Sequence, residues 1–186
     1  DIERQEKQTI SHEALSKEQL AAVIGSATGE MKNLFLVGLL TGLRLKDAVH
    51  LNASGYDAKA RLLTVVPFKT RRKNKRVTIP AHPQLLPLLE KPGPDGYYFP
   101  ETLARYKTDS QSVSKQFQAH LESCGLKTTE TPEHGQRRRA GVKYGFHSLR
   151  FSFVSLCAAL GTPQHVLGAI VGHSSPSMTL HYSRAT

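Results

Sequence analysis

No run of apolar residues in this chain is long enough to span a membrane, and apolar residues make up 39% of its 186 residues. The first eight residues, DIERQEKQ, lack the apolar segment of a secretory signal peptide. We therefore expect a cytoplasmic protein without membrane contact. The sequence also begins without methionine, and we expect it to be part of a longer protein.

Cysteine is scarce. The sequence holds 2 cysteines, Cys124 and Cys157, and neither belongs to a C-x-x-C motif or to a Cys/His cluster of the kind that binds zinc. Both stand in segments with the pattern of a helix, beside apolar residues. We interpret them as reduced thiols of the core, and we expect neither a metal nor another cofactor.

Acidic residues are too few to balance the basic ones. The sequence has 25 Lys and Arg against 15 Asp and Glu, which gives a formal net charge of +10. Such a balance favours a polyanionic partner, most simply a nucleic acid, although a basic protein without such a partner is the alternative. An anionic membrane surface is less favoured because no lysine-rich amphipathic helix is present.

Two helices are predicted before residue 45. Ser16 and Gln19 form a capping box at the start of a helix over residues 15–25. Residues 31–40 are apolar nearly all round, which predicts a buried helix that ends at Thr41-Gly42.

A further short helix begins just after Arg44. This arginine is a charge fixed at a buried junction between helices, and a buried charge needs an anionic partner. That partner is either a bound anion or a carboxylate such as Asp47, and this segment alone favours neither.

Residues 53–80 have the pattern of a small antiparallel sheet. Residues 62–66 and 76–79 are β-branched and short, as in strands, and a basic turn lies between them. In the eight residues of that turn, KTRRKNKR, six are basic. The turn is either solvated or laid along a phosphate backbone.

The second half is predicted to be mainly helical. A short helix is expected over residues 82–90, a surface loop over 91–100, and an amphipathic helix over 112–123 that ends before Gly125. Residues 127–142 are basic and loop-like. Three further helices are expected over 148–160, from Pro163 to Gly172 with Thr162 as the cap, and over 178–184.

A set of polar residues occurs in a fixed order, with four members in the last 40 residues and one in the first third of the chain. His147 and Arg150 form an H-x-x-R motif, G-H follows at His173, and Tyr182 lies near the C-terminus. Upstream, Arg44 stands in TGLRLKDAVHL. This ordered set resembles the tyrosine recombinase, or phage integrase, family over nearly the whole chain.

The resemblance implies a function and its residues. Members of the family cut one DNA strand by attack of a tyrosine, which leaves a 3′-phosphotyrosine and a free 5′-hydroxyl, and they need no cofactor. The nucleophile here would be Tyr182, and Lys69, expected at the end of the strand that leads into the basic turn, would protonate the leaving oxygen, with Lys73 and Lys75 as neighbouring alternatives. The matched catalytic positions are Arg44, Lys69, His147, Arg150, His173 and Tyr182.

The resemblance also implies a fold and partners. We expect an α+β fold that is mainly helical, with a small antiparallel sheet packed against helices, in a chain of bacterial or phage origin. The partner would be double-stranded DNA, bound by a tetramer of the full-length protein and by a monomer of this chain alone. Candidate DNA-contacting residues are Lys69, Arg71, Arg72, Lys73, Lys75, Arg76, Arg137, Arg138 and Arg139.

Two departures and two alternatives accompany this interpretation. Asp47 stands where the family often has glutamate, and Phe151 stands where histidine is common. Residues 1–14 are expected to be a linker and 15–186 the catalytic domain, without the N-terminal core-binding domain of the family. The alternatives are a type IB topoisomerase-like enzyme and a non-catalytic DNA-binding module of the same fold.

Overall fold

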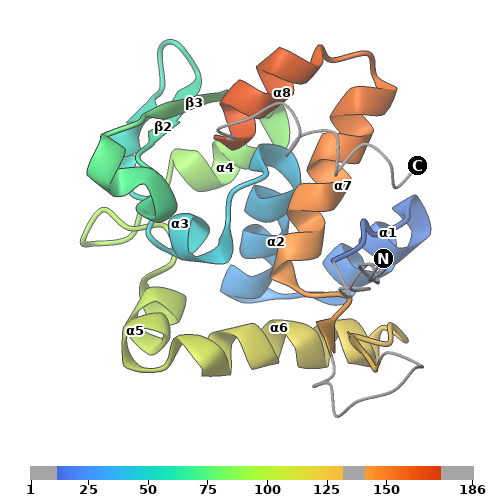
Figure 1. Cartoon of the computed structure of the whole chain (residues 1–186). Helices are drawn as coiled ribbons and strands as arrows, with labels where there is room; N and C mark the ends of the chain where they lie inside the picture. The colour runs from blue at the N-terminus through green and yellow to red at the C-terminus, as the bar shows by residue number, and fades with distance from the viewer. Residues whose placement is uncertain (1–11, 132–140, 173–186) are drawn as a thin grey trace, which may run out of the picture.

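The computed structural model of the chain describes residues 12–131 and 141–172. Figure 1 shows helices gathered around α2, with a small sheet at one side. Among the described residues, no helix is both long and apolar enough to cross a membrane. The α-helices are α1 (Lys17–Ser26), α2 (Gly29–Thr41), α3 (Leu45–Val49), α4 (Leu86–Leu89), α5 (Pro100–Thr108), α6 (Ser110–Ser123), α7 (Phe146–Ala159) and α8 (Gln164–Val171).

Helix α2 forms the centre of the core and packs against α7. Its residues Leu34, Phe35 and Val37 are fully buried, as its apolar sequence predicts. Gly38 lets the two helices approach closely, because a Cβ atom at this position would lie 2.7 Å from Cδ1 of Leu149 on α7. A methyl group there would push the two helices apart.

Aromatic rings connect α2 to α6 and α7. The rings of Phe35 on α2 and Phe117 on α6 lie 5.0 Å apart, edge to face, and Phe117 lies 5.0 Å from Phe146 at the start of α7. Such edge-to-face pairs add stability beyond the burial of their area. The start of α7 is thereby anchored in the core.

The sheet follows α3 in the sequence. Strands β1 (Tyr56–Asp57), β2 (Leu62–Val65) and β3 (Val77–Pro80) form an antiparallel sheet in the order β1-β2-β3. Leu63 on β2 pairs with Ile79 on β3, and both side chains are buried. A 3₁₀-helix, η2 (Phe68–Lys73), connects β2 to β3, and two further 3₁₀-helices are η1 (Ala53–Gly55) and η3 (Pro83–Leu85).

Most predicted elements are confirmed. Ser16 and Gln19 form the predicted capping box of α1, and α2 ends at Gly42 in a left-handed conformation with φ 65°. The mainly helical fold with a small antiparallel sheet is confirmed as well. Cys124 and Cys157 are both free thiols, each partly buried.

Four details differ from the sequence prediction. Helix α5 was not predicted, and Glu30 caps its start by accepting a hydrogen bond from the backbone N–H of Thr102 at 2.7 Å. Residues 127–142 were expected to be a loop, but β4 (Thr129–Glu130) pairs with β5 (Gly141–Val142) at the base of this segment. This pairing forms a second sheet where we expected only one.

The other two differences concern helix starts. Helix α7 begins at Phe146 rather than at residue 148, because Gly145 serves as its N-cap and its N–H is bonded to the hydroxyl of Ser148 at 3.3 Å. Helix α8 begins at Gln164 with Pro163, not Thr162, as its N-cap. The earlier start of α7 places His147 within the first helical turn.

Candidate active site

Arg44 lies between α2 and α3. The chain leaves α2 at Gly42, and Arg44 is the N-cap of α3 in an extended conformation with φ −75° and ψ 154°. Its side chain is partly buried. Among the described residues it makes no ion pair within 4.0 Å, so the predicted alternative of a close ion pair with Asp47 is wrong.

Arg150 is buried on α7, with a relative exposure of 2%. Its Nη1 donates to the carbonyl oxygen of Gly42 at 2.7 Å, and its Nη2 donates to the carbonyl oxygen of Val171 at 2.5 Å. Gly42 caps the C-terminus of α2, and Val171 is the last residue of α8. The C-terminal carbonyls of a helix carry partial negative charge, so two helix ends stabilise this guanidinium.

His147 lies one helical turn before Phe151 on α7. The rings of these two residues lie 5.5 Å apart, edge to face. Burial lowers the pKa of His147 to about 3, and the positive charges of His12, Arg150, Arg44 and Lys69 act in the same direction. His147 is therefore neutral at neutral pH and lies in the electric field of three cationic side chains.

Lys69 lies on η2 with an exposed side chain. The sequence predicted it on a strand, which is wrong: β2 ends at Val65 because Pro67 has no N–H to donate to a ladder. Pro67 instead becomes the N-cap of η2. Lys69 nonetheless lies close enough for its charge to lower the pKa of His147.

Asp47 links α3 to η2. Its carboxylate accepts a hydrogen bond from the backbone N–H of Phe68 at 2.8 Å. Burial raises the pKa of Asp47, while the bond from Phe68 and the charges of Arg44 and Arg150 oppose that rise. Asp47 thus holds the residue next to Lys69 and places a carboxyl group near both arginines.

Arg44, Lys69, His147 and Arg150 come from three separate segments. Arg150 is bonded to Gly42, two residues before Arg44, and the charges of Arg150, Arg44 and Lys69 all act on the His147 ring. His173, Tyr182 and Arg137 to Arg139 lie outside the described residues. Within the described part of the chain, no group of three or more His, Cys, Asp or Glu side chains is placed to hold a metal ion.

Sequence comparison identifies the family. The phage integrase family profile matches residues 12–186. The chain belongs to the phage integrase family. A sequence search against curated proteins gives no match.

Solved structures of integrases and recombinases share the fold. The catalytic domain of bacteriophage HP1 integrase has a TM-score of 0.66 and 21% identity, over 95% of this chain and 89% of that one. XerA recombinase has a TM-score of 0.69 and 19% identity, over 95% of this chain and 62% of its own. A lambda integrase dimer bound to a COC′ core site has a TM-score of 0.64 and 19% identity, over 96% of this chain and 62% of that one. The chain therefore spans less than two thirds of the XerA and lambda integrase chains.

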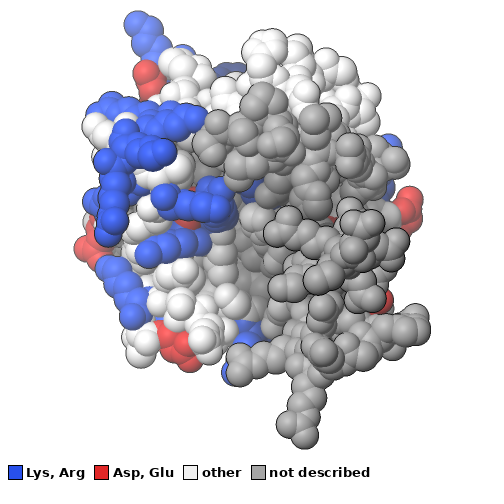
Figure 2. All heavy atoms as spheres, in the orientation of Figure 1, with Lys and Arg blue, Asp and Glu red and all other residues white. Residues whose placement is uncertain are grey.

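The basic turn of this phage integrase family member is exposed. Figure 2 shows Lys and Arg side chains gathered on the side of the molecule that carries η2 and the β2–β3 connection in Figure 1. Lys46 and Arg71 stack over the ring of Phe68, at 4.4 and 5.5 Å from its centroid. The exposed residues of the turn are Lys69, Arg71, Arg72, Lys73, Lys75 and Arg76.

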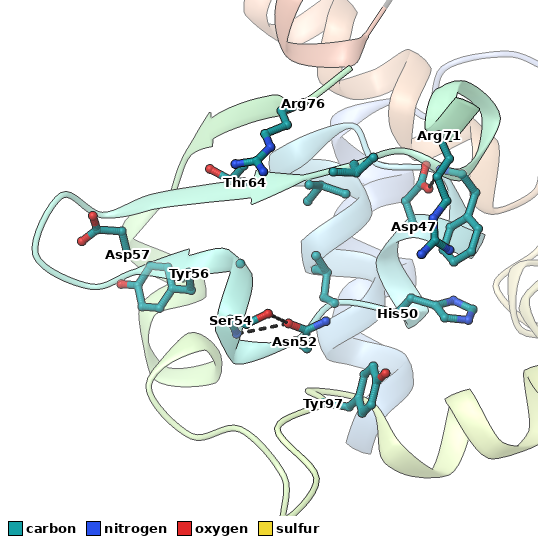
Figure 3. Close-up of a pocket in the computed structure, with 15 residues that line it drawn as sticks. Asp47, His50, Asn52, Ser54, Tyr56, Asp57, Thr64, Arg71, Arg76 and Tyr97 are labelled. Carbon is teal, nitrogen blue, oxygen red and sulfur yellow. Dashed lines mark hydrogen bonds between the residues drawn. The ribbon is translucent and has the colours of Figure 1, made fainter. Parts of the chain in front are cut away.

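A pocket of about 690 Å³ lies beside this turn. In Figure 3, Arg71, Asp47 and His50 lie toward one end of it and Tyr56 and Asp57 toward the other. Arg44, Lys69, His147 and Arg150 do not line this pocket. Asp47 and Phe68 do line it, so the candidate active site adjoins this hollow.

One residue of the site was missed by sequence reasoning. The His12 ring lies 5.1 Å from that of His147, although the sequence assigned this residue to a linker. No motif in the sequence connects the two, because only the fold brings the start of the chain to α7. The start of the family match at residue 12 agrees with this placement.

Proposed function

We propose that this chain is the catalytic domain of a site-specific DNA recombinase that breaks and rejoins strands through a 3′-phosphotyrosine. The observation that carries the proposal is the bond of Arg150 to Gly42, two residues before Arg44, which places both arginines in the region of His147, where their charges and that of Lys69 act on its ring. Three cationic groups around one neutral imidazole suit an anion with charge on several oxygens. The family match supports it because it extends to residue 186 and so includes His173 and Tyr182.

The reaction would proceed as an in-line displacement at phosphorus. Oη of Tyr182 attacks, the P–O5′ bond breaks, and the phosphorus is left bonded to Oη of Tyr182 and to the 3′-oxygen of the cleaved strand. Lys69 gives a proton to the leaving 5′-oxygen. Arg44 and Arg150 would stabilise charge on the non-bridging oxygens, to which His173 also donates.

His147 would assist the proton transfer from Tyr182. A phosphodiester anion between the arginines would offset the positive field on its ring and raise its pKa from the low value of the unliganded site. Binding of the substrate would thereby make His147 a better proton acceptor. Neither breaking nor rejoining needs an external energy source, because the phosphotyrosine bond replaces the broken phosphodiester bond.

Double-stranded DNA would be the partner, bound as a tetramer by a full-length protein. The lambda integrase dimer on its core site and the Tn1549 transposon integrase in complex with a circular intermediate DNA share this fold. The exposed basic turn supplies charge for the phosphate backbone. The segment that holds Arg137, Arg138 and Arg139 would add to this contact.

A suicide substrate tests the proposal. The substrate loses a short 5′-fragment after cleavage, so rejoining stops and protein stays on the 3′-phosphate. We expect an adduct with the unmodified chain and none with Tyr182→Phe, which keeps the ring but lacks the attacking oxygen. Tyr97→Phe is the matched control and should form the adduct at the normal rate. An adduct at full level in Tyr182→Phe would contradict the assigned nucleophile.

Arg44→Gln is a better variant than a substitution of Arg150 for testing whether an arginine stabilises negative charge on the phosphate. Arg150 holds two helix ends together, so its loss would affect folding as well as chemistry. Arg44 makes no such bond among the described residues. We expect Arg44→Gln to slow adduct formation by about 10²- to 10³-fold with the fold intact, as for loss of one preorganised donor.

Relaxation of supercoiled plasmid, compared with recombination of paired sites, would distinguish a topoisomerase from a recombinase.

A further inference from the structure

The segment that carries His12 is attached to both sides of the first turn of α7. The backbone N–H of Glu13 donates to the carbonyl oxygen of Lys143 at 3.1 Å, just before that turn. The backbone N–H of Leu15 donates to the hydroxyl of Ser152 at 2.8 Å, one turn beyond Ser148. Lys143 also pairs with the carboxylate of Glu13 at 3.3 Å. These bonds fix the backbone next to His12 relative to α7.

The side chain of His12 completes a cluster of three rings. His147 and Phe151 are four residues apart on α7 and so lie on one face of the helix. The His12 ring lies 5.1 Å from that of His147, edge to face, and 6.3 Å from that of Phe151. With the contact between His147 and Phe151, each ring touches the other two. The His147 ring is therefore held from two directions.

Within the described residues, His12 makes ring contacts with His147 and Phe151. Its Nδ1 atom is buried and meets no hydrogen-bond partner within residues 12–131 and 141–172. A buried polar atom without a partner costs about 1–3 kcal/mol. Burial also lowers the pKa of His12, so its ring is neutral near neutral pH. The shape of the ring is thus what His12 contributes to the cluster.

We infer that His12 is a positioning residue, whose ring fixes the orientation of His147 in the candidate active site. The segment at the start of the family match would then be part of the site rather than a linker. The expected effect of His12 on the reaction rate rests on the proposed function. The expected effect of His12 on the orientation of the His147 ring does not.

The neighbours of His147 make its orientation important. Its ring contacts that of His12 on the N-terminal segment, and the charges of Arg150, Arg44 and Lys69 act on it. A proton acceptor is effective only when its nitrogen lies within hydrogen-bond reach of the reacting group, and an error of about 1 Å can cost 10²-fold in rate. Without the His12 ring, His147 can rotate toward the vacated space and solvent can enter.

Three substitutions separate ring shape from polarity. His12→Phe keeps a flat ring and removes the unpartnered nitrogen, whereas His12→Gln keeps a polar side chain and removes the ring. His12→Ala removes both. His165→Ala, at an exposed position on α8, is the control.

The first measurement is an NMR titration of the His147 ring in the chain without DNA. We expect its pKa to rise in His12→Ala and His12→Gln, on the order of one pH unit, because burial of the His147 ring is reduced. His12→Phe should raise it less, because it keeps the ring that covers His147 and removes only the charge of His12, and His165→Ala should leave it close to the value in the unmodified chain. An unchanged titration in both ringless variants would overturn the inference. If His12→Ala does not fold, His12→Gln alone decides.

The second measurement is the single-turnover rate of adduct formation on the suicide substrate. We expect a loss of about ten- to a hundredfold in the ringless variants, and a rate within about threefold of normal in His12→Phe. Equal rates in His12→Gln and His12→Phe would overturn the inference, since the ring would then not matter. If the unmodified chain forms no adduct, the proposed function fails, while the titration still decides whether His12 positions His147.

Discussion

Arg150 donates a hydrogen bond from its buried guanidinium to the carbonyl oxygen of Gly42, at 2.7 Å. This bond joins the middle of α7 to the end of α2, two residues before Arg44. A second bond from the same guanidinium reaches the last residue of α8 at 2.5 Å. A bond to the backbone thus fixes the position of Arg150 relative to the segment that carries Arg44. The backbone conformation at Gly42 places the carbonyl oxygen that accepts this bond.

Gly42→Ala should destabilise the fold. Gly42 has φ 65°, and a Cβ atom there would lie 2.7 Å from Cδ1 of Phe153. A left-handed conformation costs a residue with a side chain about 1–2 kcal/mol, and overpacking costs about 1–3 kcal/mol. We expect urea denaturation to show a loss of about 2–5 kcal/mol in the free energy of unfolding.

Gly25→Ala is the matched control for Gly42→Ala. Gly25 lies within α1 at negative φ, and a Cβ atom there would meet nothing within 4 Å. Alanine is a better helix former than glycine by up to about 1 kcal/mol, so this variant should be as stable as the unmodified chain or more stable. Equal stability of the two alanine variants would show that neither strain nor contact at Gly42 matters.

The extent to which the sequence predicts the site differs from residue to residue. Arg44 was placed correctly at a helix junction, because Thr41-Gly42 ends an apolar helical stretch by a local rule. Arg150 was expected to bind phosphate, but its bonds to Gly42 and Val171 join residues that are distant in the sequence. Local patterns carry no information about such pairings.

Lys69 and His12 illustrate two other limits. The β-branched residues before Lys69 predict a strand there, but Pro67 lacks the N–H that the ladder needs and ends β2 before Lys69. His12 has no local pattern at all, and it joins the site only because Leu15 binds Ser152 across the core. Helices α1 and α2, which have local start and stop signals, were predicted well, whereas α5 and the β4–β5 pair, which depend on tertiary contacts, were not.

Asp47→Ala should destabilise the connection that carries Lys69. It removes the acceptor of the Phe68 N–H, and a backbone donor left without a partner costs about 1–3 kcal/mol. Asp47→Asn retains an oxygen that can accept the same bond, so it should lose much less. Urea denaturation measures the difference, and hydrogen exchange at the Phe68 amide should be faster in Asp47→Ala than in Asp47→Asn. Equal exchange in the two variants would contradict a holding role for this bond.

Acid should destabilise the fold through His147. The pKa of this residue in the folded chain is about 3, below the ordinary value of 6.5. Between these values the unfolded chain binds a proton that the folded chain does not, so stability falls as pH falls, by at most about 1.4 kcal/mol per pH unit. His147→Phe should therefore lose less stability than the unmodified chain when the pH is lowered from 7 to 5.

The comparison requires a histidine that is not buried. His165→Ala, at an exposed position on α8, should retain the full pH dependence. Denaturation curves at both pH values, measured for all three proteins, give the differences directly. The same pH dependence in His147→Phe and in the unmodified chain would mean that the ring titrates normally in the folded state.

DNA binding should weaken steeply with salt because the basic turn would displace counterions from the phosphate backbone. Arg71, Arg72 and Lys73 are exposed neighbours at the end of η2, and each would neutralise about one phosphate. Replacing all three with Gln should therefore reduce the slope of log K against log salt by about three contacts' worth, or about 2.7 for double-stranded DNA. Binding titrations at several salt concentrations measure this slope.

A triple Gln variant at Lys32, Lys91 and Lys115, which are exposed elsewhere on the chain, has the same change in net charge and should alter the slope far less. If both triple variants flatten the slope equally, overall charge rather than the turn determines binding. If neither does, the turn faces solvent in the complex.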